Sequence, residues 1–148
     1  MQKFMLAAAA ALAIATPASA FEVYKDYTPS TEVWNVTYVR VNPNRLDDYL
    51  EGLRQTWWTS CEVQKKQGTV LECSIFASES MSNRDFNLML VVKAPNAAAS
   101  DPSEKRYNEF MAETRKMLAE DKEKKLVEGY DTLRTFFGEQ SFRKLTLK

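Results

Sequence analysis

Hydrophobic residues recur along the chain with two different periods, and these periods predict the order of strands and helices. Runs rich in β-branched and aromatic residues are typical of strands, whereas apolar residues three or four positions apart are typical of amphipathic helices. Strand-like runs occur four times, at Val33–Val41, Val70–Ala77, Phe86–Ala94 and Ser141–Leu147. Residues 42–67 and 101–137 carry the helical spacing instead. The pattern therefore predicts the order β-α-β-β-α-β.

Both predicted helices have recognisable start and stop signals. Asn42-Pro43 and Asp101-Pro102 each place a capping residue before a proline, which suits the first helical position. Gly68 is a natural residue to follow the first helix. As one rod the second helix would measure roughly 50 Å, whereas a nine-residue strand spans about 30 Å. We therefore expect a break between Ala119 and Gly129, and a short third helix that carries Phe137 and ends at Gly138.

This order of elements is typical of the ferredoxin-like α+β fold, an antiparallel sheet with helices on one face. The first predicted strand is apolar on both faces, because Trp34 and Val36 point to one side and Val39 and Val41 to the other. A sheet with one wet face alternates more clearly between polar and apolar residues. We therefore expect both faces to be covered. A second copy of the sheet is the simplest cover, which predicts a homodimer.

The segments VWNVTYVRVNPNRLDDYLEGL and LRTFFGEQSFRKLTL, taken with the order of elements, resemble the dimeric α+β barrel superfamily. That group includes the antibiotic-biosynthesis-type monooxygenases, and the resemblance covers roughly residues 31–147. It implies a ligand cavity between sheet and helices, and several enzymes of the group need neither metal nor flavin. Its haem-dependent branches rely on a histidine, which this chain lacks, so the resemblance implies no cofactor.

The first twenty residues have the three-part pattern of a cleaved signal peptide. Lys3 precedes the apolar run Phe4–Ala15, and the segment ends in the small residues Ala18-Ser19-Ala20. We expect residues 1–20 to be removed, which would leave a single α+β domain at residues 21–148 with a formal charge of −1. The remainder contains no apolar stretch of membrane-spanning length. The predicted product is therefore periplasmic or secreted, without a membrane partner.

Composition narrows the possible chemistry. The 148 residues contain no histidine and two cysteines, which excludes Ser-His-Asp and Cys-His catalysis and argues against a structural zinc site. Lys+Arg and Asp+Glu number 20 each, so no net charge attracts nucleic acid. In an oxidising compartment Cys61 and Cys73 are candidates for a disulfide. The alternative is a pair of free buried thiols that act as small hydrophobic residues.

Aromatic and polar residues on the predicted elements indicate a ligand pocket for a small apolar or aromatic molecule. Its candidate residues are Trp34, Tyr38, Arg40, Tyr49, Trp57, Tyr107 and Met111. Ordinary core and dimer packing is the competing explanation for every one of them. Asn35, Thr37 and Arg40 interrupt the first strand with polar groups.

Without histidine, acid–base chemistry would fall to carboxylates, lysines or tyrosines, and Glu72 and Tyr38 are the candidate catalytic residues. Arg40 and Glu72 could form a buried ion pair, edge the cavity, or simply face solvent.

Three functions fit these patterns. The first is an exported domain that binds a small hydrophobic or aromatic ligand between sheet and helices. The second is a cofactor-independent enzyme of the oxygenase, isomerase or lyase type on the same scaffold. The third is a protein-interaction module that uses the second face of the sheet. No acid–base constellation is visible in the sequence, so ligand binding is the preferred hypothesis.

Overall fold

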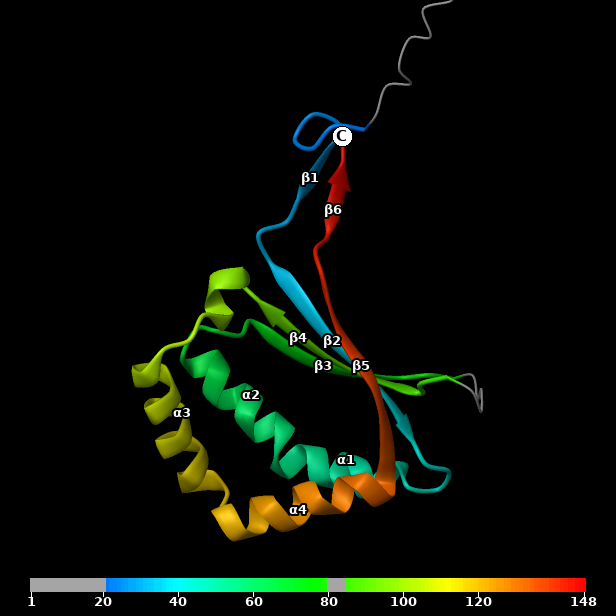
Figure 1. The fold of residues 1–148 in the computed structure, drawn as a ribbon, viewed down its shortest axis with the longest axis vertical. Helices are drawn as coiled ribbons and strands as arrows, with labels where there is room; N and C mark the ends of the chain where they lie inside the picture. Colours follow the sequence, from blue (N-terminus) through cyan, green and yellow to red (C-terminus); the bar gives the residue numbers. More distant parts are fainter. Residues whose placement is uncertain (1–20, 80–84) are drawn as a thin grey trace, which may run out of the picture.

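A computed structural model describes residues 21–79 and 85–148 of the chain; the predicted signal peptide lies outside the described residues. Four strands form an antiparallel sheet in the order β3-β4-β2-β5 (Figure 1). Their bounds are β2 (Val33–Val41), β3 (Glu72–Ala77), β4 (Leu88–Ala94) and β5 (Arg134–Phe142). The first strand of the sheet has the predicted bounds, and the second and third begin two residues later than predicted.

The helices lie on one face of this sheet (Figure 1). They are α1 (Leu46–Gln55), α2 (Trp57–Lys66), α3 (Glu104–Met117) and α4 (Glu120–Leu133), with the short 3₁₀ helix η1 (Ala97–Ser100) between β4 and α3. Helix α2 packs on β3, α3 on α2 and α4 on α1. The order of elements and the strand order confirm the predicted ferredoxin-like α+β fold.

The first helical segment was expected to be continuous, and the structure divides it at Thr56. The Thr56 hydroxyl donates a hydrogen bond to the carbonyl of Gly52 (3.0 Å) and is also hydrogen-bonded to the Tyr130 hydroxyl (2.5 Å). A threonine that bonds back to the preceding turn bends a helix. The contact with α4 therefore explains why one helical period in the sequence becomes two helices.

The helix starts lie a few residues beyond the predicted caps. Arg45 rather than Asn42 occupies the N-cap position of α1. Ser103 rather than Asp101 caps α3, where its Oγ accepts a hydrogen bond from the backbone N–H of Arg106 (3.3 Å). In both cases the proline belongs to the approach to the helix and not to its first turn.

The end of the second helical segment was predicted wrongly. The break lies at Leu118 and Ala119, at the margin of the expected interval, but α4 ends at Leu133. Phe137 and Gly138, expected in and after a third helix, belong to β5. Gly138 lies opposite Tyr38 with a φ of 135°, beside a shift of register between β2 and β5. Glycine allows the irregular backbone of β5 at this position, because other residues rarely adopt that positive φ.

The predicted last strand, Ser141–Leu147, is also divided. Strand β5 ends at Phe142, and β6 (Leu145–Leu147) pairs with β1 (Tyr27–Pro29) in a separate two-stranded arm. This arm extends beyond the end of the main sheet, and the C-terminus lies at its tip (Figure 1). Leu145 and Leu147 of the arm are exposed.

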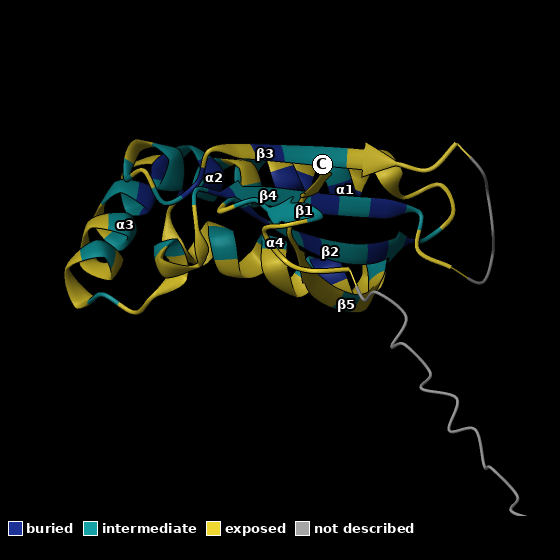
Figure 2. Cartoon of the chain, turned by 90° about the horizontal axis from the view of Figure 1, so that it is seen from above, coloured by how far each residue is buried: buried dark blue, intermediate teal, exposed yellow. Residues whose placement is uncertain are grey.

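The hydrophobic core lies between the sheet and α1 and α4. It contains Val39, Val41, Leu88 and Leu90 from the strands, and Tyr49, Leu53, Tyr130 and Leu133 from the helical side. Burial is concentrated on the central strands β2 and β4, whereas β5 is largely exposed (Figure 2). In the described part of the chain, no helix is both long and apolar enough to span a membrane.

The opposite face of the sheet has no helix of the described chain over it (Figure 1). We call it the open face. Trp34, Lys93 and Glu72 form one row across β2, β4 and β3, and Tyr38, Met89 and Phe76 form another. Phe76 is 52% exposed. The sequence expectation that apolar residues occupy both faces is therefore confirmed, and no helix of the described residues packs on the open face.

Candidate functional site

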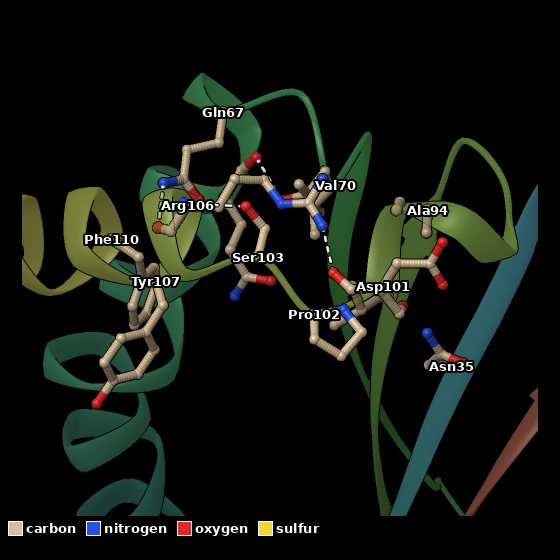
Figure 3. A pocket seen from close by; sticks show the side chains of 15 residues that line it. Asn35, Gln67, Val70, Ala94, Asp101, Pro102, Ser103, Arg106, Tyr107 and Phe110 are labelled. Atoms are coloured by element: carbon tan, nitrogen blue, oxygen red, sulfur yellow. Dashed lines mark hydrogen bonds between the residues drawn. The ribbon is translucent and has the colours of Figure 1, made fainter.

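A cavity of about 470 Å³ lies where the ends of β2 and β4 meet α2, η1 and α3 (Figure 3). Asn35 enters it from β2, and Val92 and Ala94 form its floor on β4. The remaining lining comes from the helical side and its loops, namely Gln64, Gln67, Thr69, Val70, Ala99, Ser100, Asp101, Pro102, Ser103, Arg106, Tyr107 and Phe110. A volume of this size is in the range of sites for small organic molecules.

Local hydrogen bonds hold the helical wall of this cavity in place. Asn96 caps η1 by accepting a bond from the Ala99 N–H (3.0 Å). The Gln67 side chain at the end of α2 donates to the Arg106 carbonyl (3.0 Å), which links α2 to α3. The Arg106 guanidinium donates to the carbonyl of Asp101, so the loop before α3 is held against the first turn of that helix.

The cavity combines apolar surface with hydrogen-bonding groups. Asn35 Oδ1 accepts a bond from the Ser141 hydroxyl (2.6 Å), which leaves the Asn35 amide N–H groups as donors on the cavity side (Figure 3). Tyr107 and Phe110 supply aromatic surface from α3, and Arg106 and Asp101 are its charged residues. This arrangement suits a small, mostly apolar molecule with a polar edge.

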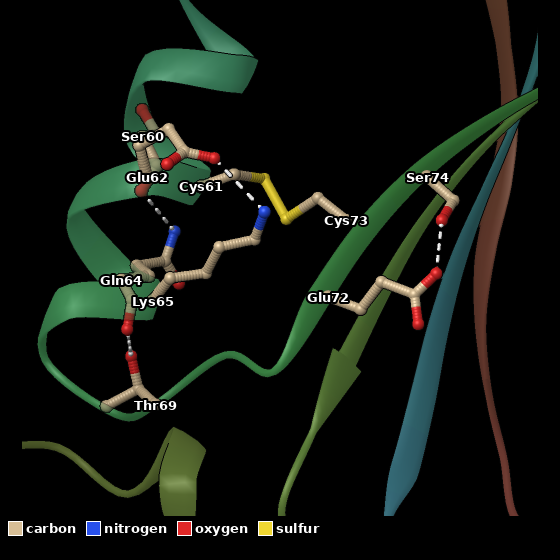
Figure 4. The surroundings of a disulfide bond; sticks show 9 residues. All are labelled: Ser60, Cys61, Glu62, Gln64, Lys65, Thr69, Glu72, Cys73 and Ser74. Carbon is tan, nitrogen blue, oxygen red and sulfur yellow. Dashed lines mark hydrogen bonds and ion pairs between the residues drawn. A yellow bond between two sulfur atoms is a disulfide. The ribbon is translucent and has the colours of Figure 1, made fainter.

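A disulfide between Cys61 of α2 and Cys73 of β3 lies behind one wall of the cavity (Figure 4). Its Cα atoms are 6.4 Å apart. Both cysteines are buried together with Val70, and Val92 packs against them. Val70 and Val92 also line the cavity, so the covalent link fixes the helix–strand pair that carries this wall.

A second cavity, of about 440 Å³, lies on the same face of the sheet between η1 and strands β2 and β5. Its lining residues are Val33, Asn35, Asn96, Ala97, Ser100, Ser141, Phe142 and Arg143. Asn35 and Ser100 therefore belong to the walls of both cavities.

The residues predicted to share one pocket are dispersed in the structure. Of the seven predicted ligand-binding residues, Tyr107 alone lines either of these two cavities. Trp57 packs between the two core clusters. Met111 is partly buried on α3. Tyr49 is enclosed in the core, where its ring makes an edge contact with Tyr130 at 5.2 Å between ring centroids.

Three of the predicted ligand-binding residues lie on the open face, away from the helices, namely Trp34, Tyr38 and Arg40. In the strand register Lys93 pairs with Trp34, and its Nζ lies 5.1 Å from the Trp34 ring centroid. Phe86 covers the Tyr38 ring at 4.7 Å, and the Arg40 guanidinium lies 4.6 Å from the centroid of the Phe137 ring. They would reach a ligand on the open face and not in either cavity.

The possible Arg40–Glu72 ion pair is not formed. Glu72 belongs to the row of Trp34, and Arg40 is six residues further along β2, which is roughly 20 Å. Glu72 Oε1 instead accepts a hydrogen bond from the Ser74 hydroxyl (2.9 Å) (Figure 4). The candidate catalytic residues Glu72 and Tyr38 lie in different rows of the open face and form no common site with the cavity.

Sequence reasoning did not select Gln64, Gln67 or Arg106, which line the cavity. Glutamine and arginine on an amphipathic helix are most often solvent-facing, and their spacing gave no sign of a cavity. Asn35 was noticeable as a polar residue within an apolar strand, which was the one available signal. Among residues 21–79 and 85–148, no group of three or more Cys, Asp and Glu side chains is placed to hold a metal ion.

No protein-family model matches this chain, and no curated protein sequence matches it either. Solved structures do resemble it in fold. HapK from Hahella chejuensis is 12% identical, with a TM-score of 0.47 over 76% of this chain and 91% of HapK. SnoaB from Streptomyces nogalater, described as a cofactor-independent oxygenase, is 12% identical, with a TM-score of 0.42 over 76% of this chain and 92% of SnoaB.

A protein described as dimeric and ferredoxin-like, from an uncultured marine organism, is 13% identical, with a TM-score of 0.42 over 80% of this chain and 90% of that one. At this level the likeness concerns the course of the backbone.

Proposed function

We propose that this protein binds a small, largely apolar or aromatic molecule in the cavity between α2, α3 and the sheet. The observation that supports it is the cavity itself, about 470 Å³ in volume, in which apolar walls and a few hydrogen-bonding groups converge. Tyr107 and Phe110 would contact the ring or apolar body of the ligand. Asn35 and Arg106 would meet its polar edge.

The test uses dansylamide, a compact aromatic probe whose fluorescence rises on transfer to an apolar site. Ala99→Leu adds bulk inside the cavity, whereas Ala98→Leu changes a neighbouring, exposed residue of the same short helix that lines neither cavity. We expect A99L to weaken binding at least tenfold and A98L to leave it unchanged. Equal affinities for A99L and wild type would contradict the proposal, because the probe would then be bound elsewhere.

Catalysis on the same scaffold is a separate hypothesis and has its own readout. Purified protein is incubated in air with a panel of phenols, naphthols and anthrones, and products are identified by mass spectrometry against A99L as the blocked control. Binding without turnover supports a carrier or sensor. A product formed by the wild type and not by A99L would make the protein a cofactor-independent enzyme that uses this cavity.

We also infer that two copies associate through the open face, in the manner of the dimeric α+β barrel superfamily. Four strands about 4.8 Å apart and six to nine residues long present a flat area of about 400 Å². Specific interfaces bury about 800 Å² per partner. Further apolar area comes from the side chains that project from this face, namely Trp34, Tyr38 and Phe76. The exposed leucines of the arm add apolar surface elsewhere on the same molecule. A twofold dimer would use this same face on both copies.

Light scattering after gel filtration tests this association. Phe76→Glu places a charge on the open face, and Val127→Glu places the same charge on an equally exposed residue of α4 (52% and 50% exposed). We expect dimers for wild type and V127E and monomers for F76E. A monomeric wild type at high concentration would contradict the dimer, and the open face would then be available to another protein.

We further propose that the protein is exported to the periplasm or secreted, on the basis of residues 1–20 and of a disulfide that suits an oxidising compartment. Cell fractionation followed by mass spectrometry of the intact protein tests this. The expected product begins at Phe21. A cytoplasmic protein that keeps Met1–Ala20 would contradict the proposal.

A further inference from the structure

The two cavities on the helical face of the sheet meet at Asn35 and Ser100. The first lies above β4 and β2, because Val92, Ala94 and Asn35 line it. The second lies above β2 and β5, because Val33, Asn35 and Ser141 line it. Together they follow a line across the strands at one end of the sheet, with Asn35 at the middle.

Helix η1 borders both cavities. Ser100 contributes to both, Ala99 lines the first alone, and Ala97 lines the second alone. The cap from Asn96 and the loop through Asp101 to Ser103 hold this short helix between β4 and α3. The two cavities are therefore adjacent and share a wall formed by Asn35 and η1.

The polar groups that line the two cavities differ in charge and in hydrogen-bonding role. At the middle, Asn35 uses its carbonyl oxygen to accept from Ser141 and keeps its amide N–H groups as donors. At the end of the second cavity lies Arg143, the charged residue of that lining. Its guanidinium donates to the carbonyls of Ser30 and Thr31 (2.9 Å each), and these neutral partners hold its positive charge in place. Tyr107 and Phe110 give the opposite end an aromatic wall.

We propose that the two cavities are one binding channel for an elongated molecule whose apolar or aromatic body occupies the first cavity and whose acidic end lies beside Arg143. A hydrogen-bond acceptor part-way along it would meet the Asn35 amide. The distance from β4 to β5 corresponds to two strand spacings, or about 10 Å, so a compact bicyclic molecule fills one chamber and a longer one reaches both. This inference rests on the proposed ligand-binding function and narrows its ligand class.

Two dansyl probes with the same fluorophore test the channel. Dansylamide is compact, and 11-(dansylamino)undecanoic acid carries a long chain that ends in a carboxylate. Leucine is placed in turn at Ala97, Ala98 and Ala99, which line the second cavity, neither cavity and the first cavity, respectively. Far-ultraviolet circular dichroism and thermal unfolding confirm that each variant is folded.

We expect dansylamide to lose at least tenfold in affinity for A99L alone. The long probe should lose at least tenfold for both A97L and A99L, bind A98L like wild type, and saturate at one molecule per chain. Unchanged affinity of A97L for the long probe, or saturation at two molecules per chain, would overturn the single channel while leaving the proposed function intact. If A99L changes neither probe, the proposed function fails as well.

Discussion

Gly52 of α1 lies directly against Tyr130 of α4, and replacing it by alanine tests how these helices are packed. A Cβ atom at this position would lie 2.8 Å from Cε1 of Tyr130, 3.2 Å from its Oη and 3.4 Å from its Cζ. The Tyr130 ring is not free to move away, because its hydroxyl is bonded to Thr56 and the ring makes an edge contact with Tyr49. The added methyl group must therefore displace either the ring or the helix.

The expected magnitude is a balance of two terms. Alanine favours a helix over glycine by about 1 kcal/mol. An extra carbon in a packed interior costs about 1–3 kcal/mol. We therefore expect Gly52→Ala to lower the free energy of unfolding by about 1 kcal/mol.

Gly129 of α4 provides a matched control, because a Cβ atom added there would have no neighbour within 4 Å beyond its own helix backbone and adjoining residues. Gly129→Ala should raise the free energy of unfolding by up to about 1 kcal/mol. The difference between the two variants, about 2 kcal/mol, isolates the steric term from helix propensity.

Urea unfolding monitored by circular dichroism measures both variants. At about 4 °C per kcal/mol, the melting temperatures of the two should differ by about 8 °C. In a Tyr130→Leu background, which removes the clashing ring atom, G52A should become as favourable as G129A. If G52A raises stability in the wild-type background as G129A does, the close packing of α1 on α4 is refuted.

Three further predictions concern stability. Replacing Cys61 and Cys73 together by alanine should cost about 2–3 kcal/mol in urea unfolding, and dithiothreitol should destabilise the wild type to a similar degree without affecting the double variant. Burial raises the pKa of Tyr49 to about 12, so the neutral phenol is favoured in the folded state. The contribution of this neutral phenol to the free energy of unfolding, at most about 3 kcal/mol, is present below about pH 10 and is lost as the pH rises towards 12. Tyr49→Phe should therefore reduce the loss of stability between pH 10 and pH 12. A pH profile of stability that Tyr49→Phe leaves unchanged would contradict the assignment. Ser103→Ala removes the α3 cap and should cost about 1 kcal/mol, which a melting curve against wild type measures.

Much of the fold could be predicted because local pattern and tertiary structure agree over β2, β3 and β4. Val33–Val41 is rich in β-branched residues and lies inside the sheet between two neighbours, so propensity and packing favour the same state. Strand β4 begins two residues after its predicted start, and a side-chain contact explains the difference. The Asn87 side chain bonds to both the N–H and the carbonyl of Val41 (2.8 and 3.0 Å) and so takes the place of a strand residue.

The boundary between α4 and β5 could not be predicted for the opposite reason. Tyr130, Leu133 and Phe137 have helical spacing, yet residues from Arg134 onwards pair with β2. Eight backbone pairs along β2 outweigh the local helical period of three side chains. Arg134 then lies with its guanidinium 5.4 Å from the centroid of the Tyr130 ring and 5.7 Å from that of Tyr49, contacts that exist only once the strand has formed. Tertiary pairing therefore overrides propensity at this position.

The location of the cavity depends on how α3 packs, which no periodicity in the sequence encodes. An aromatic residue on a helix can face the sheet, another helix or a hollow, and its spacing is the same in each case. Helix α3 packs on α2, so Tyr107 and Phe110 border an open space above the end of the sheet. Tyr49 and Trp57, one helix closer to the sheet, fill the core instead. The two cavities share Asn35 and Ser100 and both border η1, which is the physical reason to expect a single long ligand to occupy both.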